Sequence, residues 1–461
     1  MTVEVSVVIL AAGQGTRMRS RLPKVLQPLA GQPLLGHVIA TAESLKVNKI
    51  CLVYGHGGEQ VREHFVERDL VWVLQEEQLG TGHAVLQAMP QIDAGHTALI
   101  LYGDVPLVRP ETLASLVSAA SDQLAVLTAE LDDPTGYGRI IRDSDDHLLA
   151  IVEEQDATEE QKALREINTG MMACPADLLA GWLTRIAPDN ARSEYYLTDI
   201  IRCAVADGAN VVAVRTDSVA EALGVNDKMQ LAEMERLLRK RTSRALLEQG
   251  ATLVDPDRFD LRGTLSCGND VYIDVNVLVE GQVYFGDDVT VGPNCIIRNT
   301  SIGPGTRVHA NCVIEAATIG GNCEIGPFAR MRPGVEMADQ SKLGNFVEVK
   351  KSRIGSGSKV NHLSYIGDTT IGEKVNVGAG TITCNYDGAN KHPTIIGDGA
   401  FIGSGVELVA PVEIGPGATI GAGSTITKAV PAGELAIERS RQQIITGWKR
   451  PTKGVPKKPE Q

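Results

Sequence analysis

The positions of apolar side chains divide the chain into two halves with different periodicities. From Ile273 to Ile426 an aliphatic residue returns at every sixth position, and glycine often follows it. A helix would show a period of about 3.6 and an ordinary strand a period of about 2, so neither produces this spacing. A hexapeptide repeat is typical of a parallel β-helix, in which three short strands form one triangular turn. Each turn buries its aliphatic row only by stacking on the next, so the second half of the chain is predicted to be a solenoid.

The first half shows short, continuous apolar runs separated by helical patterns. Residues 5–10, 49–54 and 97–102 have the composition of fully buried strands, and residues 34–44 and 58–65 lie between them as helices. This alternation predicts an α/β domain with a mostly parallel, Rossmann-like sheet. In such sheets ligands bind at the carboxyl ends of the strands. Two loops fall there, Gly13 to Arg17 and Gly103-Asp104.

The segment from Asp227 to Gln249 contains no proline or glycine and has apolar residues at mostly three- and four-residue spacing. It predicts one helix of about 35 Å, capped at its start by Asn226 or Asp227. We therefore expect three parts, an α/β domain (1–226), a helical arm (227–249) and a coil with a C-terminal tail (250–461). Packing of the helix on the first domain is the alternative.

Composition narrows the possible partners and the compartment. The 461 residues include 57 acidic and 44 basic side chains, a net charge of −13, which argues against a nucleic-acid or membrane partner. The eight cysteines are scattered without a zinc-binding spacing, as expected of free thiols in a reducing compartment. No apolar run is long enough to span a membrane, and we expect a cytoplasmic protein. An aromatic content of 4% and 48 glycines agree with a coil of aliphatic rows and tight corners.

The loop after the first strand carries candidate phosphate-binding chemistry. A Gly-x-Gly turn alone is weak evidence, but Arg17 and Lys24 follow it closely. Backbone N–H groups of a glycine-rich turn can cradle a triphosphate while these two cations neutralise it. The loop lacks the Lys-Ser/Thr ending of a P-loop and the third glycine of a dinucleotide site, which disfavours kinases and dehydrogenases. Asp104 alone would be a helix cap or turn residue, but its place after a buried strand favours a Mg²⁺ ligand, with Asn226 as a second oxygen ligand.

These motifs resemble the sugar-1-phosphate nucleotidyltransferase family. The resemblance implies that a sugar-1-phosphate attacks the α-phosphorus of UTP, and that pyrophosphate leaves. A phosphate nucleophile is already anionic, so catalysis would rest on positioning and on charge neutralisation by Mg²⁺, Lys24 and Arg17. Gln75 would present its amide edge to uracil, and Glu153 and Asn168 would hold sugar hydroxyls. The implied nucleotide- and sugar-binding residues are Leu10, Ala11, Ala12, Gly13, Lys24, Gln75, Gly80, Thr81, Tyr102, Gly103, Asp104, Gly138, Glu153, Asn168 and Asn226, with Asp104 and Asn226 as the metal ligands.

Polar residues in the coil stand where the repeat does not need them. Arg332 and Lys350 are three hexads apart and should stack on adjacent turns, which suggests a phosphate between them. By the same count Glu348 lies next to Tyr365 and could orient or balance the charge of this site. The repeat breaks from Cys384 to Ile395, and this segment must leave the coil as a loop.

The motifs at 330–334, 344–352, 362–368 and 376–388 resemble those of the bifunctional bacterial N-acetylglucosamine-1-phosphate uridyltransferase/glucosamine-1-phosphate N-acetyltransferase family, over about residues 3–450. The resemblance implies a left-handed β-helix, a homotrimer formed through it, and small-molecule substrates that lead to UDP-N-acetylglucosamine. His362 would be the general base, because an amine nucleophile loses a proton during acyl transfer. Arg332, Lys350, Tyr365 and Asn376 would bind glucosamine-1-phosphate. The acetyl-CoA side would be contacted by Ala379, Asn385, Tyr386, Ser404, Ala422 and Arg439.

Two other functions remain open from the sequence. The chain could have only the first activity, with a coil that serves assembly as in ADP-glucose pyrophosphorylase-like proteins, or it could be a scaffold with a decayed site. His362 together with Asn385-Tyr386 favours two activities. The basic tail from Lys449 to Gln461 is predicted to be a disordered end, and a contact with CoA phosphates is the less favoured alternative.

Overall fold

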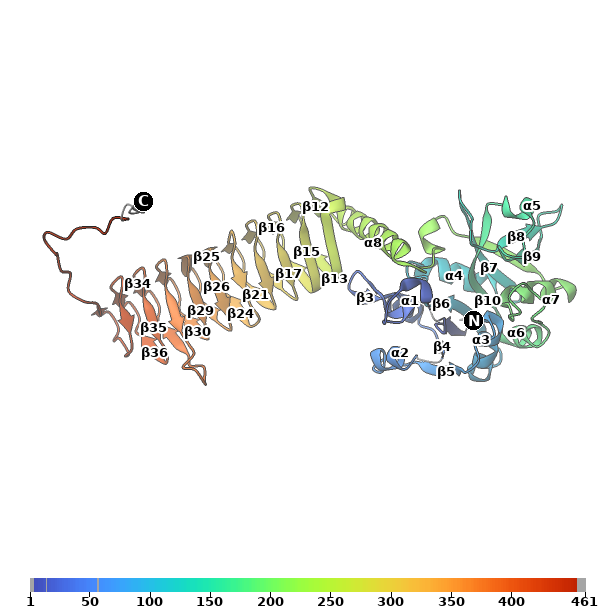
Figure 1. The fold of residues 1–461 in the computed structure, drawn as a ribbon, viewed down its shortest axis with the longest axis horizontal. Helices are drawn as coiled ribbons and strands as arrows, with labels where there is room; N and C mark the ends of the chain where they lie inside the picture. The colour runs from blue at the N-terminus through green and yellow to red at the C-terminus, as the bar shows by residue number, and fades with distance from the viewer. Residues whose placement is uncertain (1–3, 14, 56–57, 454–461) are drawn as a thin grey trace, which may run out of the picture. The chain divides into compact units, whose positions relative to one another are not determined.

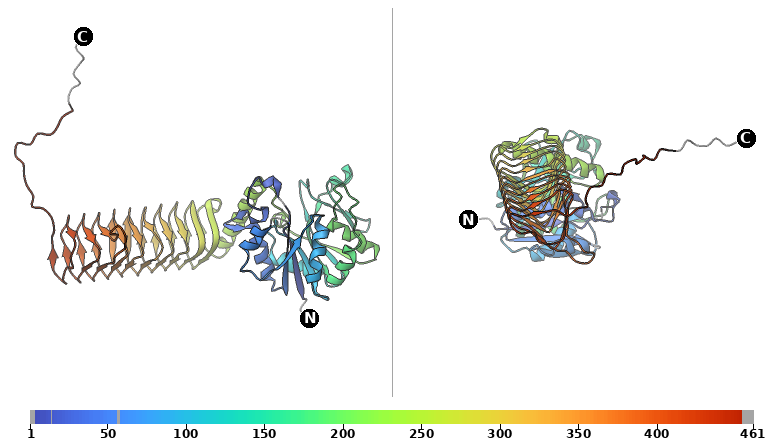
Figure 2. Two further views of the ribbon diagram at one scale, coloured as in Figure 1. Left: turned by 60° about the horizontal axis from the view of Figure 1, so that its bottom comes forward. Right: turned by 90° about the vertical axis from the view of Figure 1, so that its left-hand side faces the viewer.

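The computed structural model describes residues 4–13, 15–55 and 58–453. The chain forms two compact units (Figures 1 and 2). Unit 1 comprises residues 1–249 and 256–263, and unit 2 comprises residues 250–255 and 264–461. Residues 454–461 of the predicted disordered tail lie outside the described residues, and 449–453 have no regular secondary structure.

Unit 1 is built around a mixed, mostly parallel sheet in the order β11-β7-β10-β6-β1-β4-β5. Strand β10 runs antiparallel to both β6 and β7, and the other pairs along this order are parallel. Strands β8 and β9 form an antiparallel hairpin attached to β10. The strands of unit 1 are β1 (Val5–Leu10), β2 (Pro28–Leu29), β3 (Gln32–Pro33), β4 (Lys49–Gly55), β5 (Val71–Gln75), β6 (Thr97–Tyr102), β7 (Leu124–Glu130), β8 (Arg139–Arg142), β9 (Leu148–Val152), β10 (Glu166–Pro175) and β11 (Val211–Arg215).

Helices cover both faces of this sheet, and each face has its own apolar core. The runs at β1, β4 and β6 are buried on both sides, as their continuous apolar composition predicts. Helix α1 has the predicted bounds, and α2 lies within the predicted 58–65. The helices of unit 1 are α1 (Leu34–Ser44), α2 (Glu59–His64), α3 (Thr81–Ala88), α4 (Pro110–Ala119), α5 (Glu159–Lys162), α6 (Ala176–Leu183), α7 (Ile200–Ala206) and α8 (Lys228–Glu248).

Helix α8 is the predicted continuous helix. The Asp227 carboxylate caps it by accepting hydrogen bonds from the backbone N–H groups of Met229 and Gln230 at 2.9 and 2.8 Å. Met234 is buried in a cluster with Met18 and Leu34. The first turns of the helix therefore pack on the α/β domain of unit 1, which is the alternative left open by the sequence.

Unit 2 is a parallel β-helix whose strands pair in register from turn to turn. The predicted ladder residues point inward, and each is at most 5% exposed from Ile273 to Ile426. Within the described residues one row of strands forms an 11-stranded sheet and the other two rows join in a 17-stranded sheet. The first comprises β12 (Thr252–Leu253), β14 (Tyr272–Ile273), β16 (Thr290–Val291), β19 (Arg307–Val308), β22 (Glu324–Ile325), β25 (Lys342–Asn345), β28 (Lys359–His362), β31 (Asn376–Val377), β34 (Phe401–Ile402), β37 (Thr419–Ile420) and β39 (Leu435–Ala436). The second comprises β13 (Phe259–Cys267), β15 (Val277–Phe285), β17 (Ile296–Arg298), β18 (Ser301–Ile302), β20 (Val313–Glu315), β21 (Ala317–Ile319), β23 (Arg330–Met331), β24 (Val335–Met337), β26 (Glu348–Lys350), β27 (Arg353–Ile354), β29 (Tyr365–Gly367), β30 (Thr369–Ile371), β32 (Ile382–Cys384), β33 (Thr394–Ile396), β35 (Glu407–Val409), β36 (Val412–Ile414) and β38 (Thr425–Ile426).

One corner of the coil, which we call the αL corner, repeats a left-handed backbone conformation on successive turns. Asparagines occupy it first, and their side-chain amides hydrogen-bond along the stack. Glycines occupy it on the last turns, whereas Phe328, Phe346 and Leu363 occupy it in the middle with φ values of 57°, 56° and 50°. The full row is Asn276, Asn294, Asn311, Phe328, Phe346, Leu363, Gly380, Gly405 and Gly423. A left-handed conformation is unfavourable by about 1–2 kcal/mol for a bulky residue, so the three apolar side chains are unusual there.

Among the described residues no helix is both long enough and apolar enough to cross a membrane.

Candidate functional sites

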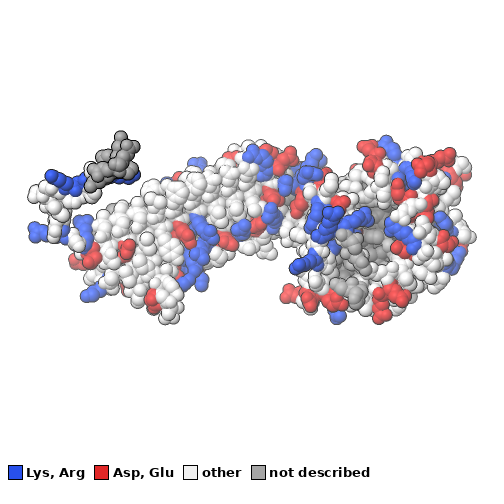
Figure 3. Space-filling model, in the orientation of Figure 1, with Lys and Arg blue, Asp and Glu red and all other residues white. Residues whose placement is uncertain are grey.

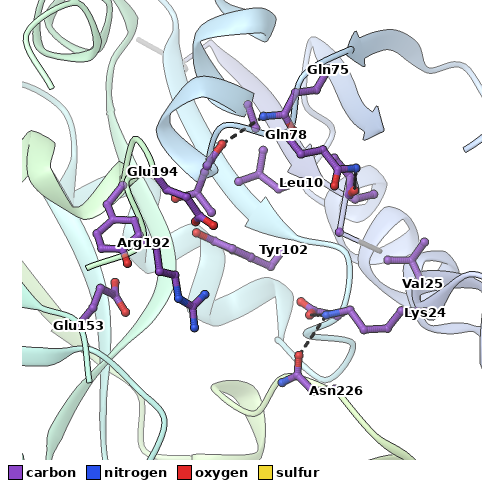
Figure 4. Close-up of a pocket in the computed structure, with 18 of the residues that line it drawn as sticks. Leu10, Lys24, Val25, Gln75, Gln78, Tyr102, Glu153, Arg192, Glu194 and Asn226 are labelled. Carbon is purple, nitrogen blue, oxygen red and sulfur yellow. Dashed lines mark hydrogen bonds and ion pairs between the residues drawn. The ribbon is translucent and has the colours of Figure 1, made fainter. Parts of the chain in front are cut away.

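A cavity of about 700 Å³ opens at the carboxyl ends of β1 and β6 in unit 1 (Figure 4). Most of the nucleotide-binding residues predicted from the sequence line it. These are Leu10, Ala11, Ala12, Gly13, Arg17, Lys24, Gln75, Gly80, Thr81, Tyr102, Asp104, Glu153 and Asn226. The two loops identified at strand ends therefore meet at one edge of the sheet, as the parallel topology requires.

A smaller cavity of about 260 Å³ adjoins the first one and shares Tyr102, Asp104 and Glu153 with it. Gly138 and Asn168 line this second space. Gly103 lines neither cavity. Its backbone N–H donates to the carbonyl of Leu10 at 2.9 Å, and a Cβ at this position would lie 3.1 Å from Leu35, so Gly103 lets the ends of β1 and β6 approach each other.

Lys24, Asp104 and Asn226 converge in the larger cavity. The Lys24 ammonium group pairs with the Asp104 carboxylate and donates to the Asn226 Oδ1 at 3.1 Å (Figure 4). Asp104 and Asn226 thus turn two oxygen atoms toward one cation, although 122 positions separate them in sequence. A carboxylate and an amide oxygen are the ligand types that Mg²⁺ uses, so this pair fits a divalent ion that keeps its other positions for phosphate and water.

Gln75 lines the larger cavity and is held in one orientation. Its side-chain Nε2 donates to the carbonyl of Gly80 at 3.1 Å and lies 3.1 Å from Nδ1 of His83. Gly80 has a φ of +117°, and a Cβ there would lie 2.6 Å from the carbonyl oxygen of Tyr195. Only glycine fits this close approach, which brings the 80–81 backbone to the cavity wall.

The Glu153 side chain lies between the two cavities. Burial raises the pKa of its carboxyl group above the ordinary value, and a hydrogen bond of 3.3 Å from the Thr198 hydroxyl opposes this shift. Figure 4 shows Arg192 and Glu194 beside Glu153. Sequence reasoning missed several lining residues, among them Gln78, Glu154, Gln155, Arg192, Glu194 and Tyr196. The only signal was the polar and aromatic run from Arg192 to Tyr196, which carries no recognisable spacing.

In the coil, the register places the predicted cations as the repeat count required. Glu348 pairs with Tyr365 on the next turn, and the backbone N–H of Arg332 donates to the carbonyl of Val349, which brings Arg332 and Lys350 to neighbouring turns. Arg332 and Lys350 belong to a row of residues that stack on one another from turn to turn. The earlier members of this row alternate in charge: Glu280, Arg298, Glu315 and Arg332. Lys350 breaks the alternation, so two like charges become neighbours, and an anion between them would relieve the repulsion.

A third cation, missed by sequence reasoning, joins this pair. Lys391 lies against the Lys350 ammonium group, and Lys391 and Arg332 lower the pKa of Lys350 below its ordinary value. Glu348 partly compensates the positive charge of this cluster, because its Oε1 accepts a hydrogen bond from Nη1 of Arg332 at 3.1 Å. Lys391 comes from the segment where the hexapeptide ladder breaks, so no repeat count could place it.

The break in the ladder forms a small hairpin, as the gap between Cys384 and Ile395 predicted. Tyr386 and Lys391 make an isolated antiparallel bridge. Asp387 holds the turn: its carboxylate accepts from the backbone N–H groups of Ala389 and Asn390 and pairs with His392 at 2.7 Å. These contacts within the hairpin therefore hold Lys391 at the coil surface.

Tyr365 and Asn385 approach each other across Gly367. A Cβ at Gly367 would lie 2.6 Å from the Tyr365 hydroxyl and 2.7 Å from Nδ2 of Asn385. Asn385 is fixed by donating to the Asp368 carboxylate at 2.5 Å. Gly367 thus leaves the space in which a predicted sugar-phosphate residue and a predicted acetyl-CoA residue meet.

His362, Ala379, Ser404 and Ala422 form one stacked row along the coil, directly before the αL corner on each turn. Successive backbone hydrogen bonds join the turns, from Gly380 to His362, from Gly405 to Ala379 and from Gly423 to Ser404. On the preceding turn Oδ1 of Asn345 accepts a hydrogen bond from Nδ1 of His362 at 2.6 Å, which orients the imidazole ring. Arg439 donates to the carbonyl of Ala422 at 2.8 Å and closes the far end of the row.

Asn376 stands apart from the other predicted sugar-phosphate residues. It lies in β31, in register between Lys359 and Phe401 on the 11-stranded sheet. Tyr365, Lys350 and Arg332 lie on the neighbouring sheet, and among the described residues Asn376 makes no side-chain hydrogen bond to them.

Comparisons with known proteins agree with the two-part organisation. Residues 7–169 match the MobA-like NTP transferase domain, residues 282–316 match the hexapeptide repeat of succinyl-transferase, and residues 393–428 match the bacterial transferase hexapeptide. The bifunctional protein GlmU of Aromatoleum aromaticum is 57% identical, over 97% of this chain and 98% of the relative. Those of Alkalilimnicola ehrlichii and Pseudomonas putida are each 55% identical over 98% of this chain, and over 97% and 99% of the relatives.

The chain belongs to the bifunctional GlmU family. The predicted fold is confirmed: a nucleotidyltransferase domain with a Rossmann-like sheet precedes a left-handed β-helix of hexapeptide repeats. The predicted pair of activities is confirmed as well, so this is a bifunctional transferase of UDP-N-acetylglucosamine synthesis, with a uridyltransferase in unit 1 and an acetyltransferase in the coil. The interpretations of the chain as a single-activity enzyme or as a scaffold are thereby set aside.

Proposed function

We propose that the two cavities of unit 1 bind UTP and N-acetylglucosamine-1-phosphate side by side. The larger cavity would hold the nucleotide, with uracil at Gln75 and the triphosphate between the 10–13 loop, Arg17 and Lys24. The smaller one would hold the sugar against Glu153 and Asn168. The observation that carries this assignment is the shared wall of Tyr102 and Asp104, because the reacting phosphates must meet where the two cavities join.

The residues of this site act by position and charge. Lys24 and Arg17 would neutralise the negative charge on the oxygens of the UTP phosphates. Glu153 would orient the sugar ring of N-acetylglucosamine-1-phosphate so that its phosphate faces the α-phosphorus of UTP. Asp104 and Asn226 would hold Mg²⁺, which when bound adds positive charge at the phosphates being transferred. With that ion present Lys24 would turn from the Asp104 carboxylate to a phosphate oxygen.

On the coil, we propose that His362 Nε2 accepts the proton of the glucosamine amine as the nitrogen attacks the acetyl carbonyl of acetyl-CoA, so that the new C–N bond replaces the C–S bond and CoA leaves as the thiolate. Asn345 orients the ring through Nδ1. Arg332, Lys350 and Lys391 would hold the sugar phosphate and Tyr365 would contact the sugar, whereas Asn376 lies on the other sheet of the coil. The row of Ala379, Ser404 and Ala422 gives a narrow track of small side chains for the pantetheine arm, with Asn385, Tyr386 and Arg439 as polar contacts.

A second copy of the chain would complete this site, and we propose a homotrimer formed through the coil. Phe328, Phe346 and Leu363 are 49%, 54% and 63% exposed at the αL corner, and the two phenylalanine rings stack with centroids 5.2 Å apart. Figure 3 shows that much of the visible coil face carries no charged side chain. Strained, exposed apolar residues beside His362 are explained if another coil covers them.

Cytoplasmic location is part of the proposal. Both co-substrates, UTP and acetyl-CoA, are products of central metabolism inside the cell. The eight cysteines are all free thiols, as expected of a reducing compartment.

A coupled assay tests the whole assignment. The protein is supplied with glucosamine-1-phosphate, acetyl-CoA, UTP and Mg²⁺, and UDP-N-acetylglucosamine is measured. His362→Ala should slow its formation from glucosamine-1-phosphate by about 10²–10⁴-fold, the usual contribution of a general base. Formation from N-acetylglucosamine-1-phosphate should be unchanged. An equal loss from both starting sugars, or no loss from either, would remove His362 from its role.

A further inference from the structure

Arg139 is the largest fully buried side chain among the described residues, with only 1% of its surface exposed. It begins β8 and belongs to no motif that the activity requires. An arginine cannot lose its charge in a protein, so burying one without partners costs several kcal/mol. The partners of Arg139 should therefore indicate what the buried charge is for.

The guanidinium group of Arg139 joins three separate segments. Nη1 donates to the carbonyl of Tyr137, and Nε and Nη2 donate to the carbonyl of Lys162 at 3.3 and 3.2 Å. Nη2 also pairs with Oε2 of Glu154 at 2.8 Å. These partners lie in the loop before β8, at the last residue of α5 and just beyond the end of β9.

Two of the three segments held by Arg139 carry residues of the smaller cavity. Tyr137 precedes Gly138, and Glu154 follows Glu153. The backbone of Arg139 is in register with Val152 and Ile167, and the N–H of Asn168 donates to the carbonyl of Gly138 at 2.8 Å. Arg139 thus lies behind the cavity wall, at the point where all three sugar-side residues are anchored.

We infer that Arg139 is a positioning residue for the sugar phosphate. Its rigid, planar guanidinium group fixes the segments of Gly138 and Glu153 relative to each other, and Asn168 is joined to Gly138 by the backbone hydrogen bond. The inference rests on the proposed assignment of this cavity to the sugar. The larger cavity takes Gly136 and Glu153 to Gln155 from the segments held by Arg139, but the groups proposed to hold uracil and the triphosphate, Gln75 and the 10–13 loop, come from β5 and the end of β1, so KM for UTP should be insensitive to Arg139.

The test is a separation of two Michaelis constants in full-length Arg139→Lys. Lysine keeps a positive charge that can pair with Glu154. It lacks the planar, forked donor group that reaches the carbonyls of Tyr137 and Lys162 together. We expect KM for N-acetylglucosamine-1-phosphate to rise about tenfold, with KM for UTP within about twofold of the wild type. Arg142→Lys is the matched control. Arg142 lies in the same strand and makes a fork with Glu166 at 2.9 and 2.8 Å, and both constants should stay unchanged in that variant.

A purely structural role would give a different pattern. If Arg139 only stabilises the fold, the active fraction and kcat fall while KM for both substrates stays the same, and that result overturns the inference. An unchanged sugar KM, or equal rises in both constants, does so too. If Arg139→Lys does not fold, Arg139→Gln, a neutral side chain that can still donate to a carbonyl, should raise the sugar KM alone. The proposed function fails separately, when the wild type forms no UDP-N-acetylglucosamine from UTP and N-acetylglucosamine-1-phosphate.

Discussion

The two candidate sites differ in how far one chain encloses them. In unit 1 the side chains of Lys24 and Asp104 are 13% and 17% exposed inside a cavity. On the coil, Arg332 is 38% exposed and Tyr386 is 60% exposed. A parallel sheet converges its strand ends on one edge, so loops from several strands can surround a ligand. A solenoid offers only rows on an outer surface, and its ligands need a second surface to exclude water. The difference explains why we assign a complete site to unit 1 and a shared one to the coil.

The largest expected effect is the loss of one activity while the other is retained. Asp104→Asn keeps the shape of the side chain but loses the charge that faces Lys24 and the proposed metal. We expect uridylyl transfer to fall by at least about 100-fold, since charge stabilisation of a phosphoryl transition state supplies several kcal/mol. Acetyl transfer, measured by thiol release from acetyl-CoA, should be unchanged. Unchanged Mg²⁺ dependence of the residual activity would contradict the metal assignment.

The next prediction asks whether the coil site depends on a second copy. Phe346→Asp places a charge in the exposed aromatic stack at the αL corner. If another coil covers this corner, the variant should sediment as a smaller species, and acetyl transfer should fall more than about tenfold. Uridylyl transfer should persist, because its cavity lies within one chain. Tyr284→Asp, a substitution at a residue that is also half exposed on the coil, is the control. A trimer that forms normally in Phe346→Asp would contradict the covering role.

A smaller effect is expected at the cation missed by sequence reasoning. Lys391→Met removes one of three positive charges but leaves the hairpin held by Asp387 and His392. We expect KM for glucosamine-1-phosphate to rise roughly tenfold, the loss of one charge-assisted hydrogen bond. KM for acetyl-CoA should be nearly unaffected. Lys374→Met, at another coil turn, should change neither constant, and an equal change in both variants would contradict the assignment.

The smallest effect concerns the stability of unit 1. Burial raises the pKa of Glu153 above its ordinary value of 4.5. As pH rises, the Glu153 carboxyl group therefore loses its proton in the unfolded chain before it does so in the folded protein. Stability is therefore lost as pH rises from the ordinary pKa to the raised one. Glu153→Gln should raise Tm at pH 7 and lose this advantage near pH 4, while sugar binding weakens. A gain of about 1 kcal/mol corresponds to roughly 2–4 °C in a unit of this size. A lower Tm at pH 7 would contradict the cost of burial.

The amino-acid sequence determined the local structure where apolar patterns are regular. The buried strands β1, β4 and β6, helix α1 and the inward ladder of the coil all follow from periodicity alone, because burial on a fixed face imposes a fixed spacing. The stacking of Arg332 on Lys350 and the pairing of Glu348 with Tyr365 followed from the same count. A repeat with in-register strands converts sequence distance directly into spatial distance.

Only the tertiary structure decided which residues from irregular segments reach the sites. Lys391 joins the cation pair through a hairpin closed by Asp387, and the spacing of that segment matches no repeat. Arg139 is buried behind the smaller cavity through contacts to segments as far away as Lys162. Glu194 and Tyr196 reach the larger cavity from a loop without periodicity. Regular helices and strands are determined by local geometry and burial. These contacts depend instead on where segments that are distant in sequence lie relative to one another, and their positions are fixed only when the whole core packs.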